Sequence, residues 1–210
     1  QQVKEALKGY FTVEFWGIET NPAIETLRKA IALGKENKVD YLLAVGGGSV
    51  IDGTKLISAG LLYEGDAWDL VTAGRPVTDT VPLSTVLTLP ATGSEMNNGA
   101  VISRHETKEK YPFYADYPVF SILDPTVTFS LPDFQIACGL ADTFVHVMEQ
   151  YMTKSNESYL MDRWSESILR TLVQIAPLIK ENKQDYHLMS EFMMSATMAL
   201  NGFIAMGVSQ

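Results

Sequence analysis

The chain has 210 residues with ordinary globular proportions, since 46% are hydrophobic and 20% are charged. Its formal net charge is −9. A surface with this overall charge repels nucleic acid and anionic membranes, so we expect neither as a partner. No apolar run is long enough to span a bilayer, so we expect no membrane partner. Cys138 is the only cysteine, which excludes an intramolecular disulfide and fits a cytoplasmic protein.

Both ends of the sequence interrupt predicted structure. Gln1 opens inside an amphipathic helix that runs to about residue 9, without an initial methionine. At the other end, residues 201–210 follow an apolar helix directly, with no closing element. We therefore expect a fragment of a longer protein, and an ordinary frayed end is the alternative.

The first 131 residues alternate between strand and helix patterns. Phe11–Trp16 alternate in hydrophobicity, as in a strand, and Asn21-Pro22 predicts a helix with Asn21 as its N-cap. Tyr41–Val45 is a short apolar run of the kind buried on both faces of a parallel sheet, and a helix from Val50 to about Ala59 follows. Residues 61–79 are mixed and rich in turns. Further strand candidates are Leu83–Leu89, Val101–Ser103 and Val119–Leu123.

Long helical patterns take over after Asp124-Pro125, over residues 132–152, 159–179 and 190–203. The fold class is therefore α/β: a doubly wound N-terminal domain over residues 1–131, followed by the start of an all-α domain over residues 132–210.

The turn Gly46-Gly47-Gly48-Ser49 lies between a predicted buried strand and a helix. Helix N-termini offer outward N–H groups to an anion, and glycines let a phosphate approach the backbone. This context predicts a phosphate site, with a plain tight turn as the alternative. Asp52, in the first helical turn, either faces the nucleotide or only complements the helix dipole.

A second turn, Thr88–Glu95, leaves a strand and gathers several hydroxyl groups. Because ligands of open α/β sheets bind beyond the carboxyl ends of strands, both turns should face one crevice. Ser94 is also expected to cap a helix.

Asp142 and His146 are four residues apart in a predicted helix, so they share one face. This pair can bind Zn²⁺ or Fe²⁺, with Glu149 orienting His146; a simple hydrogen-bonded pair is the alternative. Two ligands do not complete a catalytic metal site. His105 and His187 have polar neighbours and are expected on the surface.

Residues 42–55, 87–95 and 139–146 together resemble the iron-containing (group III) alcohol dehydrogenases, in order and in spacing. The resemblance spans the whole chain and is strongest to the branch of NADPH-dependent aldehyde reductases and butanol dehydrogenases. It implies an N-terminal dinucleotide-binding domain, a C-terminal helical domain and an active site between them. It also implies a small alcohol or aldehyde substrate and a homodimer.

The resemblance implies roles for ten residues. Gly47, Gly48 and Ser49 would hold the pyrophosphate of NADP or NAD, and Asp52 would lie at the nicotinamide end. The remaining cofactor-binding positions would be Asn21, Thr88, Thr92 and Lys110. Asp142 and His146 match the first two of four metal ligands and would be the catalytic residues, through a metal that polarises the substrate oxygen during hydride transfer.

The sequence departs from the family pattern at both ends. A first strand and a loop that selects NAD or NADP would precede it, and two histidine ligands would follow it. A nucleotide-binding fragment without catalysis and a polyol dehydrogenase-like enzyme on the same scaffold therefore remain as alternatives.

Overall fold

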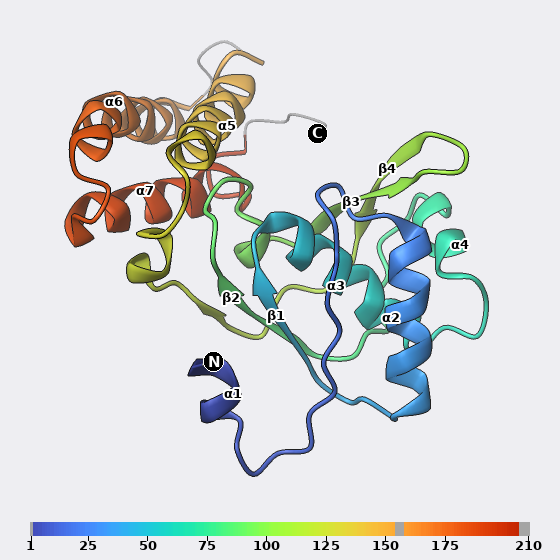
Figure 1. Ribbon diagram of the computed structural model, residues 1–210. Coiled ribbons are helices and arrows are strands. Elements are labelled where there is room, and N and C mark those ends of the chain that lie inside the picture. Colours follow the sequence, from blue (N-terminus) through green and yellow to red (C-terminus); the bar gives the residue numbers. More distant parts are fainter. Residues whose placement is uncertain (1, 154–157, 206–210) are drawn as a thin grey trace.

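The computed structural model describes residues 2–153 and 158–205, which form an α/β region followed by helices (Figure 1). The strands are β1 (Leu42–Gly46), β2 (Leu83–Leu87), β3 (Gly99–Arg104), β4 (Glu109–Tyr114) and β5 (Ser121–Ile122). The helices are α1 (Gln2–Ala6), α2 (Ile24–Glu36), α3 (Gly48–Gly60), α4 (Ala67–Thr72), α5 (Asp133–Tyr151), α6 (Tyr159–Glu181) and α7 (Tyr186–Ala199), with short 3₁₀ helices η1 (Ser94–Met96) and η2 (Pro125–Thr128). The α/β class with a parallel sheet followed by helices is confirmed.

The central sheet is parallel, with strand order β1-β2-β5. Parallel neighbours require crossover connections, and α3 supplies the one between β1 and β2. It packs against both strands, and α2 lies beside it (Figure 1). The apolar faces of α2 and α3 form one core cluster with the hairpin strand β3, and this cluster includes Leu27, Ile31 and Leu56 together with Ile102 of β3. The sheet therefore presents the carboxyl end of β1 at the start of α3, as the sequence predicted.

The strand β4 is not among the strands that the sequence predicted, and it contains Pro112. It pairs with β3 in a two-stranded antiparallel hairpin, where Pro112 lies opposite Val101. Every strand of such a hairpin is an edge strand, so a proline without an N–H group is tolerated there.

Two predictions near the N-terminus are wrong. Phe11–Trp16 forms no strand, because the segment joins no hydrogen-bonded ladder, and Phe11 is 83% exposed. Asn21 is not the N-cap of α2, which starts at Ile24 after Ala23. Instead Asn21 has a φ of 57°, a left-handed conformation that asparagine tolerates. The Pro22 carbonyl next to it accepts a hydrogen bond of 2.9 Å from Ser103 N, which ties this segment to β3.

Capping side chains set two helix starts that the apolar pattern missed. The helix α7 begins at Tyr186, four residues before the predicted start, because the Asp185 side chain accepts a hydrogen bond from Leu188 N at 3.0 Å. In the turn-rich stretch 61–79, Asp66 caps α4 in the same way. None of the helices in the described ranges is both long and apolar enough to cross a membrane.

The turn between β2 and η1 packs against the C-terminal helices. A Cβ atom on Gly139 of α5 would lie 2.5 Å from the carbonyl oxygen of Pro90. Gly93 has a φ of 60° and lies against α7, where an added Cβ would be 3.2 Å from the carbonyl oxygens of Ala196 and Thr197. Glycine is therefore required at both contacts between the α/β region and the helices.

Candidate nucleotide site and metal ligands

The glycine turn touches the second turn directly. The strand β1 ends at Gly46 and α3 begins at Gly48, so the helix N-terminus follows the strand at once. A Cβ atom on Gly48 would lie 2.4 Å from Thr92 Oγ1, and Thr88 N donates to the Gly46 carbonyl at 3.0 Å. The two turns therefore form one surface beyond the ends of β1 and β2, as the sequence predicted.

Asn21, Ser49 and Lys110 meet at the rim of this surface. Asn21 N donates to Ser49 Oγ at 3.3 Å, and Lys110 Nζ donates to Asn21 Oδ1 at 2.9 Å. Asn21 and Lys110 are exposed, and Ser49 is half-buried. These three residues come from distant parts of the chain, and they place a cation and a hydroxyl group beside the N-terminus of α3.

Asp52 is fully engaged by hydrogen bonds. Its carboxylate accepts from Ser94 Oγ at 2.7 Å and from Val101 N at 3.0 Å, and Ser94 Oγ lies 2.9 Å from Thr92 Oγ1. Burial raises the pKa of Asp52, while Lys55 and Ser94 act against that rise. Ser94 does not cap η1, because Gly93 holds that position. Its hydroxyl group links Asp52 to the second turn instead.

Sequence reasoning gave no role to Lys55, which is completely buried. Its ammonium group donates to Asn97 Oδ1 at 2.9 Å and to the Gly99 carbonyl at 2.6 Å. The signal that could have identified it is its spacing: Lys55 follows Asp52 by three residues, so both side chains share one face of the helix.

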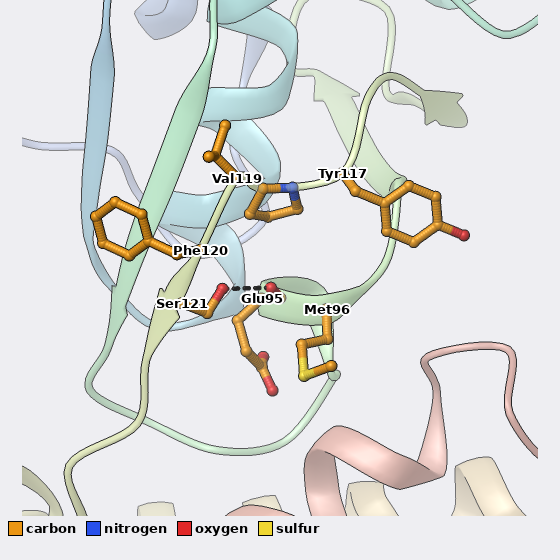
Figure 2. A pocket seen from close by; sticks show the side chains of 7 residues that line it. Glu95, Met96, Tyr117, Val119, Phe120 and Ser121 are labelled. Atoms are coloured by element: carbon orange, nitrogen blue, oxygen red, sulfur yellow. Dashed lines mark hydrogen bonds between the residues drawn. The ribbon is translucent and has the colours of Figure 1, made fainter.

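A cavity of about 220 Å³ opens beside the second turn (Figure 2). Its lining residues are Glu95, Met96, Tyr117, Pro118, Val119, Phe120 and Ser121. Ser121 Oγ donates to the Glu95 carbonyl at 2.5 Å, whereas the Glu95 carboxylate points away from Val119 (Figure 2). That carboxylate accepts a hydrogen bond from Thr197 Oγ1 of α7 at 2.5 Å, and burial raises its pKa. Glu95 therefore joins the second turn to the helical region.

Asp142 and His146 lie on one face of α5, as predicted. Asp142 Oδ2 is 3.4 Å from His146 Nε2. Thr143 between them is buried and donates to the Ala91 carbonyl at 3.4 Å, so this part of α5 lies against the second turn. Glu149 is exposed, and in residues 2–153 and 158–205 it makes no side-chain hydrogen bond with His146.

The donor atoms of this pair fit a divalent metal, but they do not surround one. His146 Nδ1 is buried without a hydrogen-bond partner in the described part of the chain, so this ring nitrogen is free to accept or donate a further bond. No group of three or more metal-binding side chains occurs among the residues that the structure describes. His105 and His187 are exposed, as predicted.

Comparison with known proteins identifies the family. The sequence model of the family described as "Iron-containing alcohol dehydrogenase" matches residues 1–125. The model for the C-terminal part, "Fe-containing alcohol dehydrogenase family, C-terminal", matches residues 136–210. Together the two matches cover most of the chain.

Individual relatives agree with this family. The NADPH-dependent aldehyde reductase YqhD of Escherichia coli is 49% identical over all of this chain and 55% of its own length. A probable NADH-dependent butanol dehydrogenase of Bacillus subtilis is 46% identical over 99% of this chain and 54% of its own.

Solved structures show the same fold. The crystal structure of YqhD superposes with a TM-score of 0.93 over 97% of this chain and 53% of that chain. The NADH-dependent butanol dehydrogenase A of Thermotoga maritima, 39% identical, also reaches 0.93, over 97% of this chain and 52% of that chain. The chain thus spans about half the length of the relatives that it matches. It belongs to the iron-containing alcohol dehydrogenase family.

Proposed function

We propose that this chain carries the nicotinamide-nucleotide site and two metal ligands of an oxidoreductase that interconverts alcohols and aldehydes. The observation that carries the proposal is the contact between the two turns, where only a glycine fits at position 48 beside Thr92. Backbone N–H groups at the start of α3 would bind the pyrophosphate without basic side chains, which suits a chain with a net charge of −9.

The surrounding residues would complete the cofactor site. Gly47, Gly48 and Ser49 would contact the pyrophosphate, and Thr88 and Thr92 would contact the cofactor from the second turn. Lys110, which donates a hydrogen bond to Asn21, would lie near the nicotinamide ribose. Asp52 would lie at the nicotinamide end, where its bonds to Ser94 and Val101 keep it fixed.

Asp142 and His146 would hold part of a divalent metal site. Such a metal supplies Lewis-acid polarisation of the substrate oxygen, and the nicotinamide supplies the hydride. The residues of this chain would position the metal relative to the cofactor. Thr143 and Gly139 hold α5 against the second turn, so Asp142 and His146 lie on a helix that packs beside the proposed cofactor site. We place the boundary between the two domains near residue 131, and propose a homodimer for the whole protein.

The names of the relatives support the substrate class, since they include an aldehyde reductase and butanol dehydrogenases. They name both NADPH and NADH, so the proposal covers either nucleotide and either Fe²⁺ or Zn²⁺. A nucleotide-binding chain without catalysis is the second candidate, favoured by the absence of a third metal ligand among the described residues.

Two measurements test this proposal. NADPH and NADH are titrated into the chain, and binding is followed by nucleotide fluorescence. Oxidation of NADPH with a short aliphatic aldehyde is then measured with Fe²⁺ or Zn²⁺ and with a chelator. We expect nucleotide binding without metal-dependent turnover, because two ligands do not complete a catalytic site. Absence of binding would overturn the proposal, and turnover that the chelator removes would show that further ligands come from elsewhere.

A further inference from the structure

Lys55 is a charged side chain in the interior, with none of its surface exposed. Burying an ammonium group is costly unless hydrogen bonds and opposite charges compensate it. Here the compensation is specific, because Lys55 Nζ donates to Asn97 Oδ1 and to the Gly99 carbonyl. A methionine of similar length would fill the same space without that cost, so the charge calls for an explanation other than packing.

Asn97 connects Lys55 to the second turn. Its Oδ1 also accepts from Gly99 N at 3.1 Å, and its Nδ2 donates to the Leu200 carbonyl at 2.9 Å. The Thr92 carbonyl, 3.5 Å from Nδ2, lies at the limit of a hydrogen bond. Lys55 therefore holds a side chain that contacts both the second turn and the end of α7.

Two carboxylates act on Lys55: Asp52 on the same helix and Glu95 on η1. Burial lowers the pKa of Lys55 to about 8, although both carboxylates act against that fall. Lys110 on β4 acts on Asp52 from the outer side. Of the neighbouring strands, β1 and β2 carry no titratable side chain, and β3 carries only Arg104, which lies over the Trp68 ring.

We propose that Lys55 is a positioning residue of the nucleotide site, which holds Asn97, and through it the second turn, against the glycine turn. The same ammonium group favours the ionised form of Asp52, the acceptor that fixes Ser94 and Val101. Lys55 would therefore set the geometry of Thr92 and Ser94 without touching the nucleotide. This inference rests on the proposed nucleotide site.

The pH dependence of nucleotide affinity tests the proposal in the unmodified chain. Affinity for NADH should fall as the pH rises through about 8, because Lys55 then loses its proton and Asp52 loses the cation that acts on it most strongly. The pyrophosphate does not titrate in this range, and a phosphate monoester, as in NADPH, has its second pKa at about 6. A profile between about pH 7 and 9.5 that is the same in the unmodified chain and in a folded Lys55→Met variant would overturn the role of the Lys55 charge.

Variants separate positioning from folding. Lys55→Met should weaken nucleotide binding about tenfold or more and abolish the pH step. Asn97→Ala leaves the buried charges in place and should also weaken nucleotide binding. If Lys55→Met fails to fold, the nucleotide affinity of Asn97→Ala tests the proposal instead. Lys35→Met is the matched control, because Lys35 also donates to a backbone carbonyl, that of Tyr63 beyond the far end of α3, and should bind like the wild type. Circular dichroism and thermal melts check that each variant folds.

The outcomes are distinguishable. If the unmodified chain binds no nucleotide at any pH, the proposed function fails. If it binds nucleotide, but folded Asn97→Ala and Lys55→Met variants keep the same affinity and pH profile, only the positioning role of Lys55 is wrong.

Discussion

The two turns and the face of α5 differ in how completely their polar groups are paired. At the turns, Asp52, Ser94 and Lys55 are linked by hydrogen bonds to segments more than 40 residues away. On α5, Asp142 and His146 face each other at 3.4 Å, and His146 Nδ1 has no partner among the described residues. Hydrogen bonds within the protein therefore fix the geometry of the two turns. On α5, by contrast, the carboxylate of Asp142 and the imidazole of His146 retain atoms that could still bind a ligand.

This difference predicts how the proposed ligand binding in each region should respond to substitutions. A preorganised turn loses affinity when its geometry is disturbed, even by a residue that does not touch the ligand. A donor pair depends instead on the two donor atoms themselves, and its substitution should leave the fold intact. The following predictions separate these two kinds of dependence.

The largest effect is expected for Asp142→Ala in a protein of the relatives' full length that carries this sequence. Loss of a ligand should lower metal-dependent aldehyde reduction about 100-fold or more. NADPH affinity should stay unchanged, because among the described residues the Asp142 side chain makes its polar contact with His146 and no hydrogen bond to either turn. The control is Asp133→Ala on the same helix, where the Asp133 side chain is 89% exposed. Full activity of Asp142→Ala without metal would contradict the proposed role.

Gly48→Ala should disrupt the proposed nucleotide site. The new Cβ atom would lie 2.4 Å from Thr92 Oγ1, so the Thr92 hydroxyl must leave its contact with Ser94. We expect nucleotide affinity to fall about tenfold or more, measured by fluorescence titration. Gly34→Ala is a matched control, because its Cβ atom would meet Leu61 Cδ2 at 2.6 Å in a contact remote from both turns. Equal losses in the two variants would indicate a general packing defect.

Gly139→Ala should destabilise the contact between α5 and the second turn. Its Cβ atom would lie 2.5 Å from the Pro90 carbonyl oxygen, a backbone atom that cannot rotate away. The free energy of unfolding should fall by about 1 to 3 kcal/mol, as in other overpacked sites. Urea denaturation measures this change. An unchanged midpoint would show that the two regions are not held together at this contact.

Glu95→Gln should have the smallest effect, and that effect depends on pH. Burial raises the pKa of Glu95 above its unfolded value, so the folded wild type binds more protons between the two values and loses stability as the pH rises through them. The substituted amide has no proton to lose, so the variant should gain stability relative to the wild type as the pH rises through this window. Thermal melts from acid to neutral pH test this, with the exposed Glu36→Gln as the control. A constant difference would contradict the raised pKa.

Features with a local cause were predicted well. The strand, glycine turn and helix over residues 41–60 follow from a short apolar run, three glycines and a helical period, all within one stretch of sequence. Tertiary pairing decided the features that were predicted wrongly. Phe11–Trp16 has the pattern of a strand but no ladder partner, whereas β4 is paired in spite of Pro112.

The sequence by itself determined that Asp142 and His146 share a face, because the period of an α-helix fixes side chains four residues apart. It also determined that two polar turns follow buried strands. Only the tertiary structure decided which atoms meet: Lys110 with Asn21 across 89 residues, Ser94 with Asp52, and Lys55 with Asn97. The register of the sheet and the packing of α3 against it set these contacts, and no local pattern encodes either.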